Sequence, residues 1–218
     1  MTRPHLGVRR QLQRIADRRY WRGLRRLEQS STPEYRGYLE EQLRRTLSKR
    51  STDSGVGAEV LVREVAHHSG PGSSVLCVGC RNTAELDRFR AHNLEPVGID
   101  LFAQGNGIVV MDMHALHFDD DSFDAVYASH SLEHSYDVAT VVAEIRRVAR
   151  DGAVVGIEVP VRHKGSDADR VVFTGCDDLR AALVRPEDAV LYEEEQPPNS
   201  PTNSQGSAVA RLVFRLAT

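Results

Sequence analysis

The stretch Ser74-Val-Leu-Cys-Val-Gly-Cys-Arg-Asn-Thr-Ala-Glu85 decides the fold, because its pattern changes from strand to helix within a few residues. Val75–Val78 is a short, apolar run rich in β-branched residues, as is typical of a buried parallel strand. After Gly79, the spacing of Asn82 and Glu85 is that of an N-cap and capping box, which predicts the start of a helix. The sequence therefore predicts strand, turn and helix, with the free N–H groups of the helix facing the strand end.

The next predicted strand, Pro96–Leu101, ends in a carboxylate that suits a nucleoside ligand. Asp100 follows Gly79 by 21 residues, the spacing at which a β-α-β unit places a carboxylate beside a ribose. Arg81 and Ala84 stand where a dinucleotide fold needs its second and third glycines, so close approach to a pyrophosphate is disfavoured. S-adenosylmethionine has a ribose but no phosphate, and its carboxylate could meet Arg81 and the helix N-terminus.

Three further segments carry a resemblance to a known family. Gly98–Leu101, Met111–Tyr127 and Ser129–His134 resemble, in order and spacing, the successive motifs of class I S-adenosylmethionine-dependent methyltransferases of the type 11 branch. The resemblance covers roughly residues 74 to 160. It implies an α/β fold: a Rossmann-like, mostly parallel seven-stranded sheet with helices on both faces, here with an N-terminal helical appendage. It also implies S-adenosyl-L-methionine as cofactor.

The resemblance and the strand-end positions together predict the binding residues. In the family, the position of Asp112 accepts the exocyclic amine of adenine and that of Met113 covers the ring. The predicted cofactor-binding residues are Gly79, Cys80, Arg81, Asp100, Leu101, Asp112, Met113, His114 and Ser129.

The predicted reaction is methyl transfer to an oxygen or nitrogen of a small-molecule metabolite. Proximity and orientation of the two substrates are expected to contribute most of the rate acceleration, and a base helps only if the acceptor must lose a proton. His134 and His130, which follow the fourth predicted strand, are the candidate bases, with His134 preferred. A second interpretation is a non-catalytic relative with the same fold, because Arg81-Asn82-Thr83 replaces the Gly-x-Gly of the family.

Composition limits the class of protein. The chain has 218 residues, of which 40% are hydrophobic and 27% charged, as is ordinary for a soluble globular protein. No apolar run is long enough to predict a membrane span, and no apolar segment near the N-terminus predicts a secretory signal, so a cytoplasmic protein is expected. Cys77, Cys80 and Cys176 are too few for a zinc site, and no metal is predicted.

The first fifty residues form a separate, basic module. They hold 14 basic and 5 acidic residues, against 14 and 26 in the remainder. Two amphipathic helices are predicted, over residues 8–28 and from Thr32-Pro33 onward. The chain is thus divided into residues 1–50, a lid or substrate-recognition module expected to line the acceptor pocket rather than the cofactor pocket, and residues 51–218, the methyltransferase domain.

The basic module leaves a third interpretation open, an RNA-directed methyltransferase. Beyond Tyr20-Trp21 no clustered aromatic residues offer a stacking surface for bases, which argues against a nucleic-acid partner. The sequence leaves open whether the protein forms a homodimer. The remaining predicted elements are a helix over 58–68, strands over 107–110, 123–128 and 153–159, helices over 137–150 and 177–184, and a final hairpin of strands 189–193 and 208–216.

Overall fold

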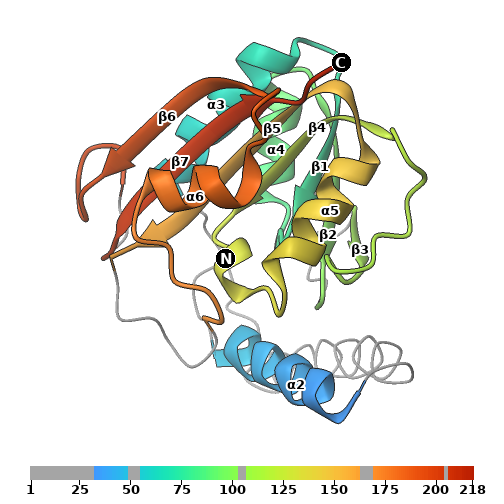
Figure 1. Cartoon of the computed structure of the whole chain (residues 1–218), viewed down its shortest axis with the longest axis vertical. Helices are drawn as coiled ribbons and strands as arrows, with labels where there is room; N and C mark the ends of the chain where they lie inside the picture. The colour runs from blue at the N-terminus through green and yellow to red at the C-terminus, as the bar shows by residue number, and fades with distance from the viewer. Residues whose placement is uncertain (1–31, 49–54, 103–106, 163–168, 204–205) are drawn as a thin grey trace, which may run out of the picture.

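The computed structural model describes residues 32–48, 55–102, 107–162, 169–203 and 206–218. They contain a seven-stranded sheet in the order β3-β2-β1-β4-β5-β7-β6, parallel except for β7, which is antiparallel to both neighbours (Figure 1). The strands are β1 (Ser74–Val78), β2 (Glu95–Asp100), β3 (Ile108–Val110), β4 (Phe123–Ser129), β5 (Ala149–Val161), β6 (Ala189–Gln196) and β7 (Ala208–Arg215).

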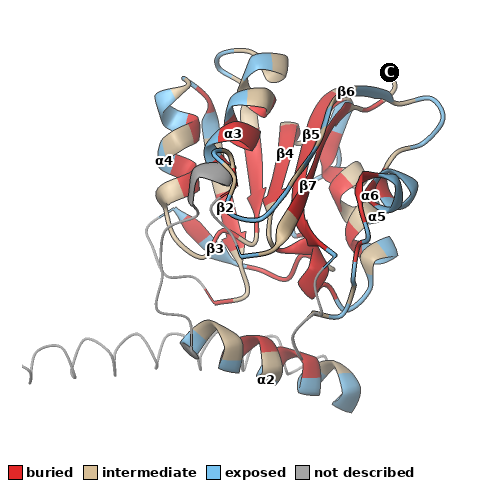
Figure 2. Ribbon diagram, turned by 90° about the vertical axis from the view of Figure 1, so that its left-hand side faces the viewer, coloured by how far each residue is buried: buried red, intermediate tan, exposed pale blue. Residues whose placement is uncertain are grey.

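Helices cover both faces of the sheet (Figure 2). One face carries α3 (Gly55–Ser69) and α4 (Ala84–Ala91), and the other carries α5 (Val138–Val148) and α6 (Cys176–Leu183). The short 3-10 helix η1 (Leu132–His134) follows β4, and α2 (Pro33–Ser48) lies across one end of the sheet. The predicted α/β, Rossmann-like fold is confirmed.

The alternation of side chains along the central strands builds two separate cores. Leu76 and Val126 point to the face covered by α5, where Ile145 is 2% exposed. Val75 and Tyr127 point to the opposite face, where they pack with residues of α3 and α4. Since both faces are covered, the strands are apolar almost throughout, as a parallel sheet requires.

The antiparallel end of the sheet is tied together by a buried cation. Arg211 of β7 is 0% exposed; its Nε lies 2.5 Å from Oε2 of Glu158 on β5, and its Nη1 lies 2.6 Å from Oε2 of Glu194 on β6. Nη2 donates to the carbonyl of Thr202. A buried guanidinium is tolerated only when its charge and donors are matched in this way.

Most predicted elements are present with shifted ends. The helix predicted from Pro33 is confirmed as α2, whereas β5 begins at Ala149, where a helix was expected to continue.

The predicted capping box is wrong. Asn82 Oδ1 does accept from the N–H of Ala84 at 2.9 Å, but the side chain of Glu85 is buried and accepts from the hydroxyl of Tyr127 at 3.3 Å.

The helix expected over residues 8–28 lies outside the described residues. Among the helices that are described, none combines the length and the apolar character that crossing a membrane would require.

Candidate functional site

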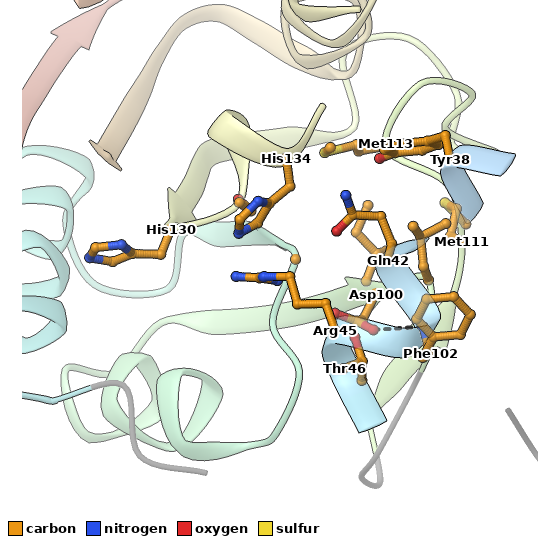
Figure 3. A pocket seen from close by; sticks show the side chains of 14 residues that line it. Tyr38, Gln42, Arg45, Thr46, Asp100, Phe102, Met111, Met113, His130 and His134 are labelled. Carbon is orange, nitrogen blue, oxygen red and sulfur yellow. Dashed lines mark hydrogen bonds between the residues drawn. The ribbon is translucent and has the colours of Figure 1, made fainter. Parts of the chain in front are cut away.

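Three parallel strands end at the same level, at the end of the sheet that faces α2. Val78 of β1 pairs with Ile99 of β2 and with Ala128 of β4, so Gly79, Asp100 and Ser129 follow at the same edge. A cleft with an empty volume of about 510 Å³, open part included, lies at this edge (Figure 3). The cleft is lined by Tyr38, Gln42, Arg45, Thr46, Gly79, Ile99, Asp100, Leu101, Phe102, Met111, Met113, His130, Ser131 and His134.

Gly79 allows the turn after β1 to pass close to η1. Its φ is 76°, in the left-handed region, and a Cβ at this position would lie 2.5 Å from Cβ of Ser131. Ser131 in turn donates its hydroxyl to the carbonyl of Val78 at 3.1 Å. The glycine is therefore needed by the packing of the two site loops, as well as by the turn.

Asp100 ends β2 with its carboxylate at the cleft. Oδ1 accepts from the N–H of Phe102 at 2.6 Å. Burial raises the pKa of Asp100 to about 6, against the effects of that hydrogen bond and of the guanidinium groups of Arg81 and Arg45. A ligand that donates hydrogen bonds would favour the ionised form of this carboxyl.

The apolar part of the cleft comes from the chain after β2 and β3. Ile99, Phe102, Met111 and Met113 are between 1% and 8% exposed. Thioether and aromatic side chains pack well against a planar ring. Figure 3 shows Phe102 and Met111 on the same side of the cleft as Asp100.

The helix α2 forms one wall of the cleft, and the sequence did not single out its residues Gln42, Arg45 and Thr46. Tyr38, Gln42, Arg45 and Thr46 line the same cleft as Gly79 and Asp100. The expectation that the N-terminal module lines the acceptor pocket rather than the cofactor pocket stays a prediction, and α2 lines the same cleft as the strand ends. Within the described part of the chain, the hydroxyl of Tyr38 has no hydrogen-bond partner, although this residue is 1% exposed. A buried hydroxyl without a partner at a cleft wall is suited to a ligand.

A hydrogen-bonded group fastens α2 to the domain. Tyr35 of α2 donates its hydroxyl to Oδ2 of Asp112 at 2.6 Å, and Nδ1 of His114 lies 2.7 Å from Oδ1 of the same carboxylate. Nε2 of His114 accepts from the N–H of Tyr136 at 2.9 Å, so Nδ1 carries the ring proton. Burial alone would raise the pKa of Asp112, but the hydrogen bonds from His114 and Tyr35 outweigh it and lower that pKa.

Several predicted binding residues turn their side chains to other partners. Asp112 and His114 hold Tyr35, as described, and do not line the cleft. Sγ of Cys80 lies 3.4 Å from the carbonyl oxygen of Cys77, and the hydroxyl of Ser129 donates to Glu158 at 3.2 Å. Arg81 lies near Arg45 and Asp100 without lining the cleft. Gly79, Asp100, Leu101 and Met113 do line it.

The two candidate bases differ in orientation. His130, with φ 50°, turns the chain from β4 into η1, and its ring points away from the cleft (Figure 3), where Nε2 lies 3.1 Å from Oε1 of Glu158. His134 points toward the cleft, next to the guanidinium of Arg45. Its Nδ1 lies 2.8 Å from Oδ1 of Asp169, a residue that no sequence pattern indicated.

Comparison with known proteins agrees with this fold. The family model described as "Methyltransferase domain" matches residues 52–157. The sterol 24-C-methyltransferase ERG6B of Gibberella zeae is 31% identical over 112 residues, which are 43% of this chain. The matched region spans only 30% of that relative. Residues 52–157, just under half of the chain, thus match the methyltransferase domain family, and the fold described above is the one found in S-adenosylmethionine-dependent methyltransferases.

Solved structures show the same fold at low identity. The 1,6-didemethyltoxoflavin-N1-methyltransferase of Burkholderia thailandensis, solved with S-adenosylhomocysteine, is 17% identical with a TM-score of 0.67, covering 86% of this chain and 92% of that one. The [4+2]-cyclase SpnF is also 17% identical, with a TM-score of 0.60, covering 73% and 82% of the two chains. Because one of these two proteins is a cyclase, the reaction of the present chain has to be argued from its site.

Proposed function

We propose that this protein transfers the methyl group of S-adenosylmethionine to an oxygen or nitrogen of a small molecule. The observation that carries the proposal is the composition of the cleft, in which a strand-end carboxylate, an apolar wall and a guanidinium face one space beneath α2. These are the groups that would meet the ribose, the adenine and the carboxylate of this cofactor.

The residues present fit the parts of the cofactor. Asp100 would accept hydrogen bonds from the ribose hydroxyls, and Met111 and Met113 would cover the adenine. Arg45, with Arg81 close by, would hold the carboxylate. When bound, S-adenosylmethionine supplies an electrophilic methyl group on a positively charged sulfur.

A small acceptor is favoured by the enclosure of the cleft. The helix α2 lies across the strand ends and is fastened by Tyr35, so a ligand in the cleft would lie between α2 and the ends of the strands. Of the two candidate bases, His134 is the one whose ring lies at this space. We therefore assign the base to His134.

A second candidate function is that of a binding protein with the same fold but without turnover. The specific observation in its favour is the turn after β1, where Arg81-Asn82-Thr83 stands in place of the glycines of the family. Both candidates predict cofactor binding, and turnover separates them.

The first experiment is calorimetry with S-adenosylmethionine and S-adenosylhomocysteine. We expect one site per chain, and Arg45→Met should weaken binding roughly ten- to hundredfold, because a charge-assisted hydrogen bond is worth about 1.5–3 kcal/mol. Arg44→Met is the matched control, since Arg44 is the exposed neighbour on the same helix and does not line the cleft. No binding of either compound by the folded wild type would contradict the proposal.

Turnover is then measured as release of S-adenosylhomocysteine in the presence of pooled small-molecule hydroxyl and amine compounds. Acceptor-dependent release that His134→Gln reduces would identify an enzyme. Tight binding without release for any pool would favour the binding protein.

A further inference from the structure

The hydroxyl of Tyr38 is a buried group that lacks a partner in the ligand-free protein. Tyr38 of α2 is 1% exposed, and within the described residues its hydroxyl has no hydrogen-bond partner. A polar group that is buried and unpaired lowers the stability of a fold, and such groups are rare in folded proteins. Because Tyr38 also lines the cleft, a ligand bound there is in a position to supply the missing partner.

The ring of Tyr38 is held in place by its neighbours. The ring centres of Tyr35 and Tyr136 lie 5.2 and 5.6 Å from its own. The ring centre of His114 and the guanidinium carbon of Arg170 each lie 5.8 Å away. A buried ring packed in this way has little room to rotate. The hydroxyl is therefore kept pointing from α2 toward the cleft, as Figure 3 shows.

This hydroxyl acts as a donor, because it keeps its proton. Burial raises the pKa of Tyr38, and the charge of the Asp112 carboxylate raises it further. The guanidinium groups of Arg170 and Arg45 have the opposite effect, but a smaller one. A neutral phenol donates one hydrogen bond. The ligand atom that meets this hydroxyl must therefore offer a free electron pair.

Tyr38 lies at the part of the cleft that would hold a base. Its ring packs against His114 and the charge of Asp112 acts on its hydroxyl, so it lies close to the segment Met111–His114. In the proposed function, Met111 and Met113 of this segment cover the adenine. The ring nitrogens N1, N3 and N7 of adenine carry free electron pairs, whereas its exocyclic amine donates.

We propose that the hydroxyl of Tyr38 donates a hydrogen bond to a ring nitrogen of the adenine of S-adenosylmethionine. This proposal rests on the proposed function and gives α2 a part in recognising the base. Because the hydroxyl is unpaired before the ligand arrives, no bond within the protein has to be broken when it pairs with the ligand. A base without an electron pair at that position leaves the donor unpaired and is disfavoured.

The test is calorimetry with S-adenosylhomocysteine and with three analogues, in which N1, N3 or N7 of the adenine is replaced by C–H. Tyr38→Phe keeps the ring and should weaken binding of S-adenosylhomocysteine roughly tenfold. For one of the three analogues, wild type and Tyr38→Phe should bind equally well, because the partner of the hydroxyl is already missing. Tyr136→Phe is the control, since Tyr136 packs on the same ring but is 44% exposed and does not line the cleft.

A second measurement is the stability of the ligand-free protein in urea. Tyr38→Phe should be at least as stable as the wild type, because it removes an unpaired buried hydroxyl and keeps the packing of the ring. A marked loss of stability would mean that the hydroxyl already has a partner within the fold, which would overturn the proposal.

The binding data can overturn the proposal in three ways. Wild type and Tyr38→Phe could bind S-adenosylhomocysteine equally well, or the wild type could bind all three analogues as tightly as the parent compound. Tyr38→Phe could also weaken the binding of all four compounds by the same factor, which would place the hydroxyl at another part of the cofactor. Absence of binding to the wild type contradicts the proposed function itself, so the two failures are distinguishable.

Discussion

The chemistry of single residues in this cleft depends on what burial does to their charge. Asp100 has an ordinary carboxyl pKa in an unfolded chain, but burial raises that pKa to about 6 in the ligand-free protein. A ribose hydroxyl donates a stronger hydrogen bond to the ionised carboxylate than to the neutral carboxyl, so a bound cofactor should draw the carboxyl toward ionisation.

Cofactor affinity should therefore rise with pH through the pKa of Asp100. Because the ionised carboxylate binds the ribose hydroxyls more strongly, we expect a gain of up to about tenfold from about pH 5 to about pH 7. Asp100→Asn keeps the shape and one acceptor oxygen, so its affinity should be lower at neutral pH and independent of pH in this range. Calorimetry over the pH series measures both, and a wild-type profile as flat as that of Asp100→Asn would place the ribose elsewhere.

At the scale of secondary-structure elements, the antiparallel end of the sheet depends on one buried pair. Arg211 of β7 and Glu158 of β5 are 0% and 2% exposed. Burial alone would raise the pKa of Glu158. The hydrogen bonds and charges of His130 and Arg211 have the larger effect and lower that pKa. The carboxylate is therefore charged in the folded protein and requires its partner.

Arg211→Met should cost about 3–5 kcal/mol of unfolding free energy, since it leaves a buried carboxylate without its cation. Urea unfolding measures this loss. The double variant Arg211→Met/Glu158→Gln should recover part of it, because the uncompensated charge is removed. Arg180→Met is the control: it breaks a more exposed pair with Glu193 and should cost less than about 1 kcal/mol. Equal losses for Arg211→Met and Arg180→Met would contradict this account of the β5-β7-β6 end.

At the scale of the whole molecule, α2 is a wall of the cleft and contributes little to the cores. Its buried residues Tyr38, Leu39 and Leu43 cluster with Phe102, apart from the two cores on the faces of the sheet. Loss of α2 should thus leave the sheet folded while opening the cleft.

A shortened chain that begins at Ser51 should retain its near-UV circular dichroism for the most part but lose at least about tenfold in cofactor affinity, because Tyr38, Gln42 and Arg45 are removed with α2. This is the reverse of the sequence-based expectation, in which such a chain would still bind the cofactor. Calorimetry compares the cofactor affinity of the two chains. An unchanged affinity would indicate that α2 contacts only the acceptor.

The sequence by itself determined the fold and the end of the strands at which the candidate site lies. The change of period at Gly79 and the apolar runs that end at Asp100 and Ser129 are local patterns, and parallel strands bring such ends to one edge. The family motifs lie within the same segments. Gly79, Asp100, Leu101 and Met113 could therefore be placed at the site without coordinates.

Only the tertiary structure decided which side chains share the cleft. Asp112, the expected adenine contact, accepts a hydrogen bond from Tyr35 of α2, 77 residues away in the sequence, and Asp169 contacts His134 from a segment without periodicity. The left-handed backbone at His130 turns one candidate base away from the cleft and leaves His134 facing it. The physical reason is that periodicity reports which face of an element is buried, whereas the partner of a buried polar group is set by how distant segments pack, and no local pattern encodes that.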